Sequence, residues 1–269
     1  MAKSDDVSRH ATGGAIWPLP ILGRDGMLLV LTWAAGSVDA ISYLGLGHVF
    51  TAMMTGNTVL LGLAIGQGQV LAALRSVIAL AGFCLGAAVG AFIVEREEKR
   101  EDWPPVVTVA LALEAITLGL FTVAWFLTDT PRSAGVLHVL ILLSGLAMGI
   151  QAVAVRHLGV PGIATTYITG TLTSLMVDLT GYLRRTVVPS FAAGSLGKTV
   201  PGASAALRWE HRVGLLAAVF LAYGLGALAS TILQARSSSL TALLPLVAVA
   251  LVVVNASSLH WRRQHRSSH

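Results

Sequence analysis

The sequence is poor in cysteine and in charge. Its 269 residues include one cysteine, Cys84, which excludes an internal disulfide and a cluster of thiolate metal ligands. Only 12% of the residues are charged, about half of the ~25% that is typical of soluble domains, so polar side chains are too few to cover a water-exposed surface. These shortages exclude a disulfide-stapled scaffold, an intrinsically disordered chain and an ordinary cytosolic enzyme.

Apolar residues are in excess, at 55% of the chain with a mean hydropathy of +0.75. Six stretches reach or approach the ~20 apolar residues that a helix needs to cross a bilayer, and they lie at residues 27–47, 71–94, 105–127, 136–157, 213–233 and 240–257. The first is longer than the apolar core of a signal peptide and carries Asp39, so we expect a retained helix. The predicted fold class is therefore all-α, a polytopic membrane helix bundle.

Polar segments divide the chain into one membrane domain, residues 27–257, between two tails, residues 1–26 and 258–269. Within the domain, the halves 27–127 and 136–257 hold three spans each, and the long loop 184–212 carries Arg and Lys among Gly, Ser and Pro. The formal net charge is +5, but no basic run is interleaved with aromatics. This pattern favours basic loops beside anionic lipid over nucleic-acid binding.

Two further apolar segments, residues 55–66 and 169–183, are short for a span. At 1.5 Å per residue they reach only about 18 and 22 Å of a ~30 Å hydrocarbon core. If both are re-entrant and the N-terminus is cytoplasmic, 15 of the 18 Lys and Arg lie on the cytoplasmic side, and if both cross, 13 do. The positive-inside rule favours six full spans, two short re-entrant helices and two cytoplasmic termini.

The two short segments resemble each other. Residues 50–57 align without gaps with residues 164–171 at an offset of 114, with identities at Thr51/Thr165, Thr55/Thr169 and Gly56/Gly170. Upstream, a two-residue slip pairs Asp39 with Gln151. Because each half holds three full spans, the second half would enter the membrane from the opposite face. That is the inverted-topology repeat of many secondary transporters.

The runs GSVDAISYL at residues 36–44 and FTAMMTGNT at 50–58 resemble the YoaK family of bacterial inner-membrane proteins. The second half, with TTY at 165–167 and TGT at 169–171, fits the same family, so the resemblance covers roughly residues 27–257. It implies an integral, multi-pass protein of the inner membrane. It supplies no substrate, because the family has no assigned function.

Acidic residues within apolar spans are the first candidates for chemistry, since an ionised carboxylate in lipid costs at least ~2.5 kcal/mol. Asp39 lies deep in the first span, and Gln151 is its aligned partner in the second half. The Asp39 carboxylate and the Gln151 amide would then face each other near the pseudo-two-fold axis that relates the halves. Asp39 and Glu114, which lies near the middle of the third span, are candidates for proton coupling. The alternatives are a neutral Asp39 bonded to Ser42 or Tyr43, and a Glu114 that pairs with Arg75 or a histidine or stays protonated.

The start of each short segment is the second candidate. A helix that begins inside a membrane presents free backbone N–H groups and the positive end of its dipole, which bind anions or polar solutes. Glycine lets a solute approach the backbone, and hydroxyl or amide side chains add polar contacts. The predicted solute-binding residues are therefore Asp39, Gln151, Thr55, Gly56, Asn57, Thr169, Gly170 and Thr171. The same residue types also cap ordinary bends, which the sequence leaves open.

These features predict a membrane transport protein, a permease or channel for a small polar or anionic solute, with its site at the repeat interface. The alternative is an intramembrane enzyme or lipid handler such as a lipid-phosphate phosphatase, which would gather Arg and Glu at the short helices. We assign no catalytic residue and expect no cofactor and no metal. The expected partners are membrane lipid and a small-molecule solute, with no nucleic acid, and a homo-oligomer stays open.

Overall fold

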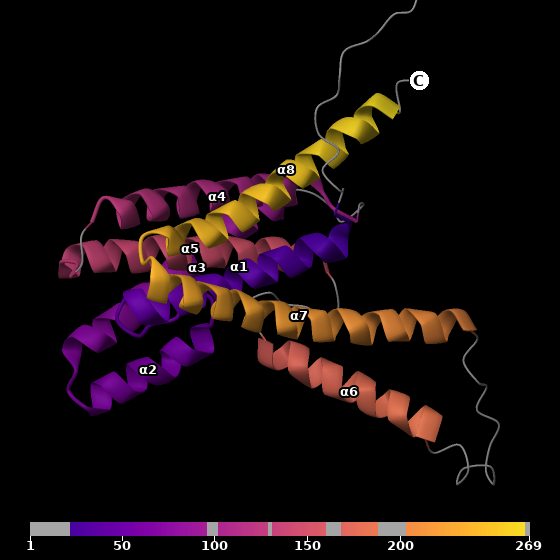
Figure 1. The fold of residues 1–269 in the computed structure, drawn as a ribbon, viewed down its shortest axis with the longest axis horizontal. Helices are drawn as coiled ribbons and strands as arrows, with labels where there is room; N and C mark the ends of the chain where they lie inside the picture. The colour runs from indigo at the N-terminus through magenta and orange to yellow at the C-terminus, as the bar shows by residue number, and fades with distance from the viewer. Residues whose placement is uncertain (1–21, 96–101, 129–130, 160–167, 188–202, 267–269) are drawn as a thin grey trace, which may run out of the picture.

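In the computed structural model, the described residues are 22–95, 102–128, 131–159, 168–187 and 203–266. Every regular element in these ranges is a helix (Figure 1). The order is α1 (Arg24–Gly45), α2 (Met54–Gly66), α3 (Val70–Val94), α4 (Pro105–Phe126), α5 (Ala134–His157), α6 (Ile168–Val187), α7 (Ala203–Arg236), the 3₁₀ turn η1 (Leu240–Ala242) and α8 (Leu243–Arg266).

Six of the described helices are long and apolar enough to cross a membrane, namely α1, α3, α4, α5, α7 and α8. These are the six spans that the sequence predicts, with bounds that differ by a few residues except where α7 and α8 extend further into polar sequence. The two remaining helices coincide with the two short segments, but α6 is longer than predicted: α2 has 13 residues, whereas α6 has 20 and reaches about 30 Å instead of about 22 Å. We keep the name short helices for both. The prediction of an all-helical bundle with six spans is therefore confirmed.

The long helices alternate in direction, so their ends gather at two faces of the bundle (Figure 1). We call these the Arg24 face, where α1 begins, and the Gly45 face, where α1 ends. At the Arg24 face the Asn255 side chain of α8 holds the chain before α1, because its Oδ1 accepts the Leu22 N–H at 3.1 Å and its Nδ2 donates to the Leu22 carbonyl at 3.0 Å.

The helix pairs α1–α7 and α3–α5 make the most extensive contacts, and glycines allow their backbones to approach. Gly36 of α1 lies against the carbonyl of Tyr223 in α7, and Gly226 of α7 lies against the carbonyl of Trp33 in α1. Glycines between α3 and α5 likewise face the opposing backbone, at Gly82, Gly86, Gly90, Gly145 and Gly149. The small-residue stripes of the sequence thus serve close packing.

The short helices begin near the centre of the molecule and run toward opposite faces (Figure 1). Residues 46–53 turn back alongside α1, so α2 starts beside the middle of that helix and returns toward the Gly45 face. With 13 residues, α2 reaches about 20 Å. From its start beside the first turn of α2, α6 runs toward the Arg24 face.

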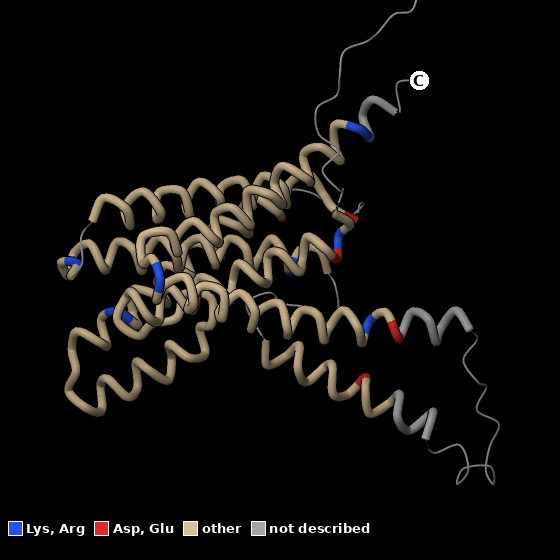
Figure 2. Tube along the Cα trace, viewed as in Figure 1, with Lys and Arg blue, Asp and Glu red and all other residues tan. Residues whose placement is uncertain are grey.

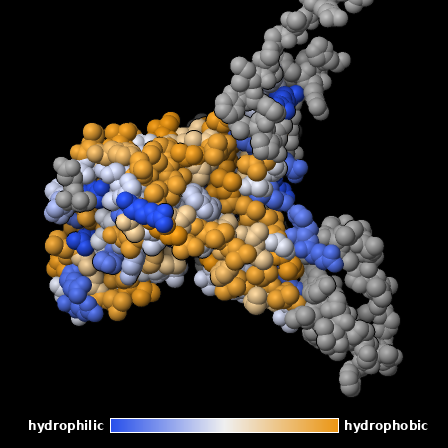
Figure 3. All heavy atoms as spheres, in the orientation of Figure 1, coloured by the Kyte–Doolittle hydropathy of each residue, from blue (hydrophilic) through white to orange (hydrophobic). Residues whose placement is uncertain are grey.

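The charges of the described chain gather toward the two faces, and the tubes between them carry few (Figure 2). Apolar side chains cover most of the side of the bundle that is visible between the faces (Figure 3). Such a belt is what a bilayer requires of the protein surface that it contacts.

Candidate functional site

Asp39 is the polar centre of the site. It lies on α1 and is only 3% exposed, and its Oδ1 accepts backbone N–H groups from Thr51 at 2.8 Å, Ala52 at 2.7 Å and Met53 at 3.4 Å. Those N–H groups belong to the chain that leads into α2. A single carboxylate oxygen therefore fastens the start of the short helix against the first long one.

The second oxygen of Asp39 accepts a hydrogen bond from the Tyr223 hydroxyl of α7. The Ser42 hydroxyl, one turn further along α1, bonds the Thr51 hydroxyl at 2.8 Å. Asp39 thus joins α1, the loop before α2 and α7. Sequence reasoning named Ser42 and Tyr43 as alternative partners and missed Tyr223, although a phenol within an apolar span signals the need for a buried partner.

A cavity of about 390 Å³ lies where the two short helices begin, and we call it the central cavity. The first turn of α2 contributes Thr55 and Gly56, and the first turn of α6 contributes Thr169. Phe83 of α3 and Tyr223 of α7 complete the wall with apolar residues of the α2 and α6 starts. Three of the predicted solute-binding residues therefore share one cavity.

A second cavity, of about 290 Å³, adjoins the central one, and we call it the side cavity. It is lined by Gly36, Asp39 and Tyr43 among others, and it shares Met53 and Tyr223 with the central cavity. These two side chains therefore form a partition between the cavities, and the hydrogen bond to Asp39 holds one of them in place.

Asn57, Gly170 and Thr171 do not line the central cavity. Asn57 is fully buried, and its amide bonds the Phe50 backbone, accepting from the N–H at 3.0 Å and donating to the carbonyl. Its contacts stabilise the loop before α2. Thr171, its aligned counterpart in α6, is also buried, with 1% exposed.

Gln151 and Glu114 lie apart from the central cavity. Gln151 of α5 is fully buried and donates through Nε2 to the carbonyl of Leu31 at 3.0 Å, two turns before Asp39 on α1. Glu114 of α4 is fully buried as well, and neither of its carboxylate oxygens makes a hydrogen bond within the described part of the chain. Asp39 and Gln151 thus contact different stretches of the molecule.

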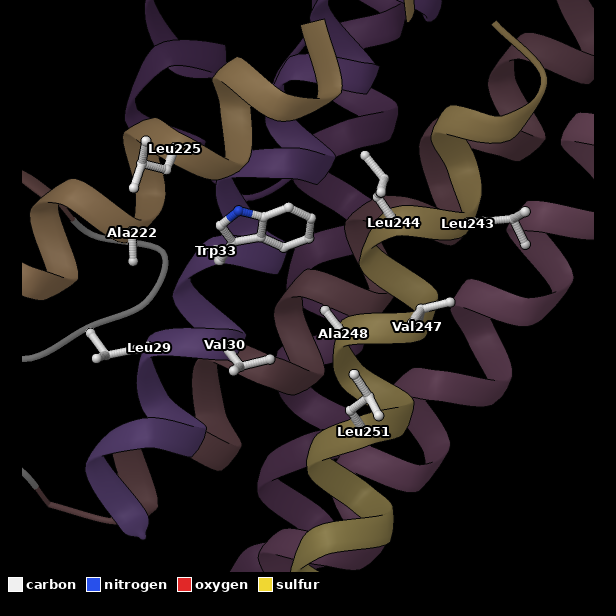
Figure 4. A pocket seen from close by; sticks show the side chains of 10 residues that line it. All are labelled: Leu29, Val30, Trp33, Ala222, Leu225, Leu243, Leu244, Val247, Ala248 and Leu251. Atoms are coloured by element: carbon white, nitrogen blue, oxygen red, sulfur yellow. The ribbon is translucent and has the colours of Figure 1, made fainter. Parts of the chain in front are cut away.

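A third hollow, larger than the central and side cavities, has a different character. An apolar groove of about 530 Å³ opens between α7 and α8, with the Trp33 ring of α1 between the two helices (Figure 4). Aliphatic side chains make up the rest of its wall, so it offers little that could select a polar solute. Among the described residues, no three His, Cys, Asp or Glu side chains come together in a way that could hold a metal ion.

The fold and its buried polar centre define a polytopic helical membrane protein. The chain belongs to the family described as "Protein of unknown function (DUF1275)", whose model matches residues 27–256. It is similar to the UPF0700 transmembrane protein YoaK of Bacillus subtilis (strain 168), with 46% identity over 160 residues that cover 60% of this chain and 69% of that protein. The resemblance to the YoaK family is therefore confirmed. No solved structure matches the chain.

Proposed function

We propose that this protein is a permease or channel that carries a small polar or anionic solute through the central cavity. The observation that carries the proposal is that the first turns of two short helices, 114 residues apart in sequence, line the same cavity. Helix N-termini aimed at a shared central site are the arrangement that secondary transporters use to bind polar and anionic groups.

An inverted repeat underlies this arrangement, and the burial of the short helices supports it. At an offset of 114, each residue from Met54 to Leu60 has the same exposure class as its counterpart from Ile168 to Ser174. In both helices the Thr of the Thr-Gly pair is exposed, and the residue after the Gly is buried. Equivalent positions in α2 and α6 thus have equivalent surroundings.

The helix contacts support the same repeat. If α1 to α4 correspond to α5 to α8, the contact of α1 with α7 corresponds to that of α5 with α3, and these are the two most extensive helix pairs. The contact of α8 with α1 likewise corresponds to that of α4 with α5. These matching helix contacts are what a pseudo-two-fold axis that exchanges the two halves would produce.

Both short helices are re-entrant in the mechanism that we propose. The length of α2 supports this, because about 20 Å falls short of a ~30 Å hydrocarbon core. The 20 residues of α6 reach about 30 Å, but α6 is not among the described helices that are apolar enough to cross a membrane. With the Arg24 face cytoplasmic, as the positive-inside rule prefers, both termini lie inside and the protein resides in the inner membrane. The Gly45 face then lies on the other side of the membrane, and the solute reaches the central cavity from either face.

The central cavity suits weak binding of a small solute. It offers the Thr55 and Thr169 hydroxyls and two helix N-termini, and the described residues that line it include no Lys, Arg or His. Transport requires binding that is favourable enough to admit the solute and weak enough to release it. A phosphatase would need cationic groups around the transferring phosphate, so the cavity lends the enzyme alternative no support.

Tyr223 and Met53 act as the partition that opens during transport. When the Tyr223 hydroxyl leaves Asp39, the central and side cavities join into one path along α1 and α7. Asp39 couples this movement to protonation, since only the carboxylate accepts at both oxygens from Tyr223 and the loop before α2. Glu114 is the second candidate for proton coupling, because burial without a hydrogen bond among the described residues favours its neutral form.

Flux through proteoliposomes tests the proposal. Purified protein is reconstituted, and light scattering follows vesicle volume after osmotic steps with formate, acetate, nitrate, urea or glycerol at several pH values. We expect native protein to accelerate the flux of at least one of these solutes, and Asp39→Asn to lower that flux at least tenfold and to remove its pH dependence. Asp102→Asn is the control, because that carboxylate is 85% exposed at the Arg24 face. Permeability equal to that of empty vesicles for every solute, or unchanged pH-dependent flux in Asp39→Asn, would contradict the proposal.

A further inference from the structure

A separate polar cavity of about 310 Å³ lies where α2 turns into α3, and it shares no residue with the central cavity. Its polar lining comes from three places in the chain. The loop after α1 supplies His48, the turn between α2 and α3 supplies Gln67 and Gln69, and α3 supplies Arg75 and Ser76. We call it the Arg75 cavity.

Arg75 brings a positive charge to this cavity, and no carboxylate among the described residues lines the cavity beside it. None of the ion pairs among the described residues involves Arg75, and its Nη1 donates to the Gly47 carbonyl at 3.5 Å. The side chain is partly buried. A guanidinium withdrawn from water gains most from an oxyanion, which its planar fork of N–H groups binds through two oxygens at once.

The start of α3 adds to the same positive field. Gln69 is its N-cap residue and makes no side-chain capping bond. The Gln69 and Val70 N–H groups bond backbone carbonyls, whereas those of Leu71 and Ala72 make no backbone bond among the described residues. Arg75 also lines a hollow of about 410 Å³ formed with residues 68–72 at that helix start. The dipole of a 25-residue helix and the guanidinium thus favour negative charge in one place.

The loop after α1 is shaped around the arginine. Gly47 has a φ of +84°, and a methyl group on it would lie 2.5 Å from Nη1 of Arg75, so glycine gives the side chain its room. His48 follows with a φ of +63°, in the left-handed region, and its ring contacts Tyr43 edge-on with centroids 4.9 Å apart. The His48 N–H donates to the Tyr43 carbonyl at 3.1 Å, so both positive φ values belong to the tight turn that ends α1.

We propose that the Arg75 cavity is an oxyanion-binding site at the Gly45 face, for a carboxylate or a phosphate. The oxyanion bridges the Arg75 guanidinium and the start of α3, with Gln67 and Ser76 as further donors. Its source is either a free anion or the phosphate of a membrane lipid, since α2 beside it exposes Val59, Leu63 and Ile65. This site stands independently of transport through the central cavity, and it would persist if that transport were absent.

Two measurements on the full-length protein distinguish the sources. In lipid-depleted detergent, tryptophan fluorescence follows thermal unfolding in sodium phosphate or sodium acetate against sodium chloride at equal ionic strength. After extraction from bilayers of phosphatidylcholine and phosphatidylglycerol, native mass spectrometry counts the retained phospholipid. Arg75→Gln is compared with Arg236→Gln, which removes an exposed arginine at the end of α7.

We expect phosphate or acetate to raise the unfolding temperature of the native protein and of Arg236→Gln, with affinity at least tenfold weaker in Arg75→Gln. Phosphatidylglycerol retained by the native protein and lost from Arg75→Gln supports the site with lipid as the source. If Arg75→Gln does not fold, Gln69→Glu replaces it, because a carboxylate beside Arg75 should compete with the ligand and leave the fold intact. Equal anion response and equal lipid retention in native and variant proteins would overturn the proposal, as would the absence of both in the native protein.

Discussion

At the scale of single residues, the structure depends on how Asp39 is satisfied. A carboxylate buried in an apolar bundle is costly unless hydrogen bonds replace water. Here three backbone N–H groups and one phenol take that role. Because the N–H groups lie in the loop that starts α2, the same bonds that stabilise Asp39 also hold the short helix in position beside the central cavity.

The effect of replacing Asp39 on stability should therefore depend on whether the new side chain can accept hydrogen bonds from the loop before α2. Asp39→Ala leaves buried N–H donors without a partner, and we expect it to lower the free energy of unfolding by about 2–4 kcal/mol. Asp39→Asn keeps an acceptor oxygen for the loop, so we expect a loss of about 1 kcal/mol. Thermal unfolding in detergent provides the comparison. An Asp39→Ala protein as stable as Asp39→Asn would show that the loop does not depend on these bonds.

The sequence predicts which residue types belong to the site better than it predicts their contacts. Asp39, Thr55, Gly56 and Thr169 could be named because acids and Thr-Gly pairs are unusual in apolar segments, and all four line one of the two adjoining cavities. The pairing of Tyr223 with Asp39 could not be predicted, because the bond spans 184 residues and no local pattern specifies it. Asn57, in contrast, was predicted to face solute and instead bonds the loop.

At the scale of elements, length and hydropathy predict where the helices lie, and small residues predict where they approach. The α2 helix begins one residue before its predicted start, and α3, α4 and α5 agree within two residues with the predicted spans. What the sequence does not specify is which small-residue stripes meet. The pairing of α1 with α7 and of α3 with α5 depends on shape complementarity across the bundle, which is a property of the assembled fold.

Two glycines of α7 test this packing, since they lie two residues apart and face different surroundings. A methyl group on Gly226 would meet the carbonyl of Trp33, whereas one on Gly224 would meet nothing within 4 Å. We expect Gly226→Ala to destabilise the protein by about 1–3 kcal/mol through overpacking. Gly224→Ala should be neutral or stabilising by up to about 1 kcal/mol, because alanine favours helix. Equal unfolding temperatures for the two variants would contradict the α1–α7 contact.

At the scale of the whole molecule, the proposed transport depends on topology. If α2 is re-entrant, the Arg24 and Asp102 ends lie on one side of the membrane and Gln67 lies on the other. If α2 crosses, Arg24 and Gln67 share a side and Asp102 is opposite. The proposed transport path requires the re-entrant arrangement, in which only the six long helices cross the membrane.

Single cysteines at these positions decide the topology, in a background where Cys84 is replaced by alanine. We expect a membrane-impermeant maleimide added to intact cells to label Gln67→Cys, and to label Arg24→Cys and Asp102→Cys only after the membrane is opened. Joint labelling of Gln67→Cys and Arg24→Cys from one side would mean that α2 spans the bilayer.

The central claim is that α2 and α6 begin at one shared cavity, and cross-linking in native membranes tests it most directly. Thr55→Cys combined with Thr169→Cys in the same background should be joined by a short bismaleimide, and mass spectrometry of proteolytic peptides should detect the bridge. Gly66→Cys with Thr169→Cys is the matched control, because Gly66 lies at the far end of α2, about 16 Å along the helix from Thr55. We predict efficient cross-linking of the first pair and little of the second. An unlinked first pair, or equal linking of both, would contradict the shared cavity and with it the proposed path for the solute.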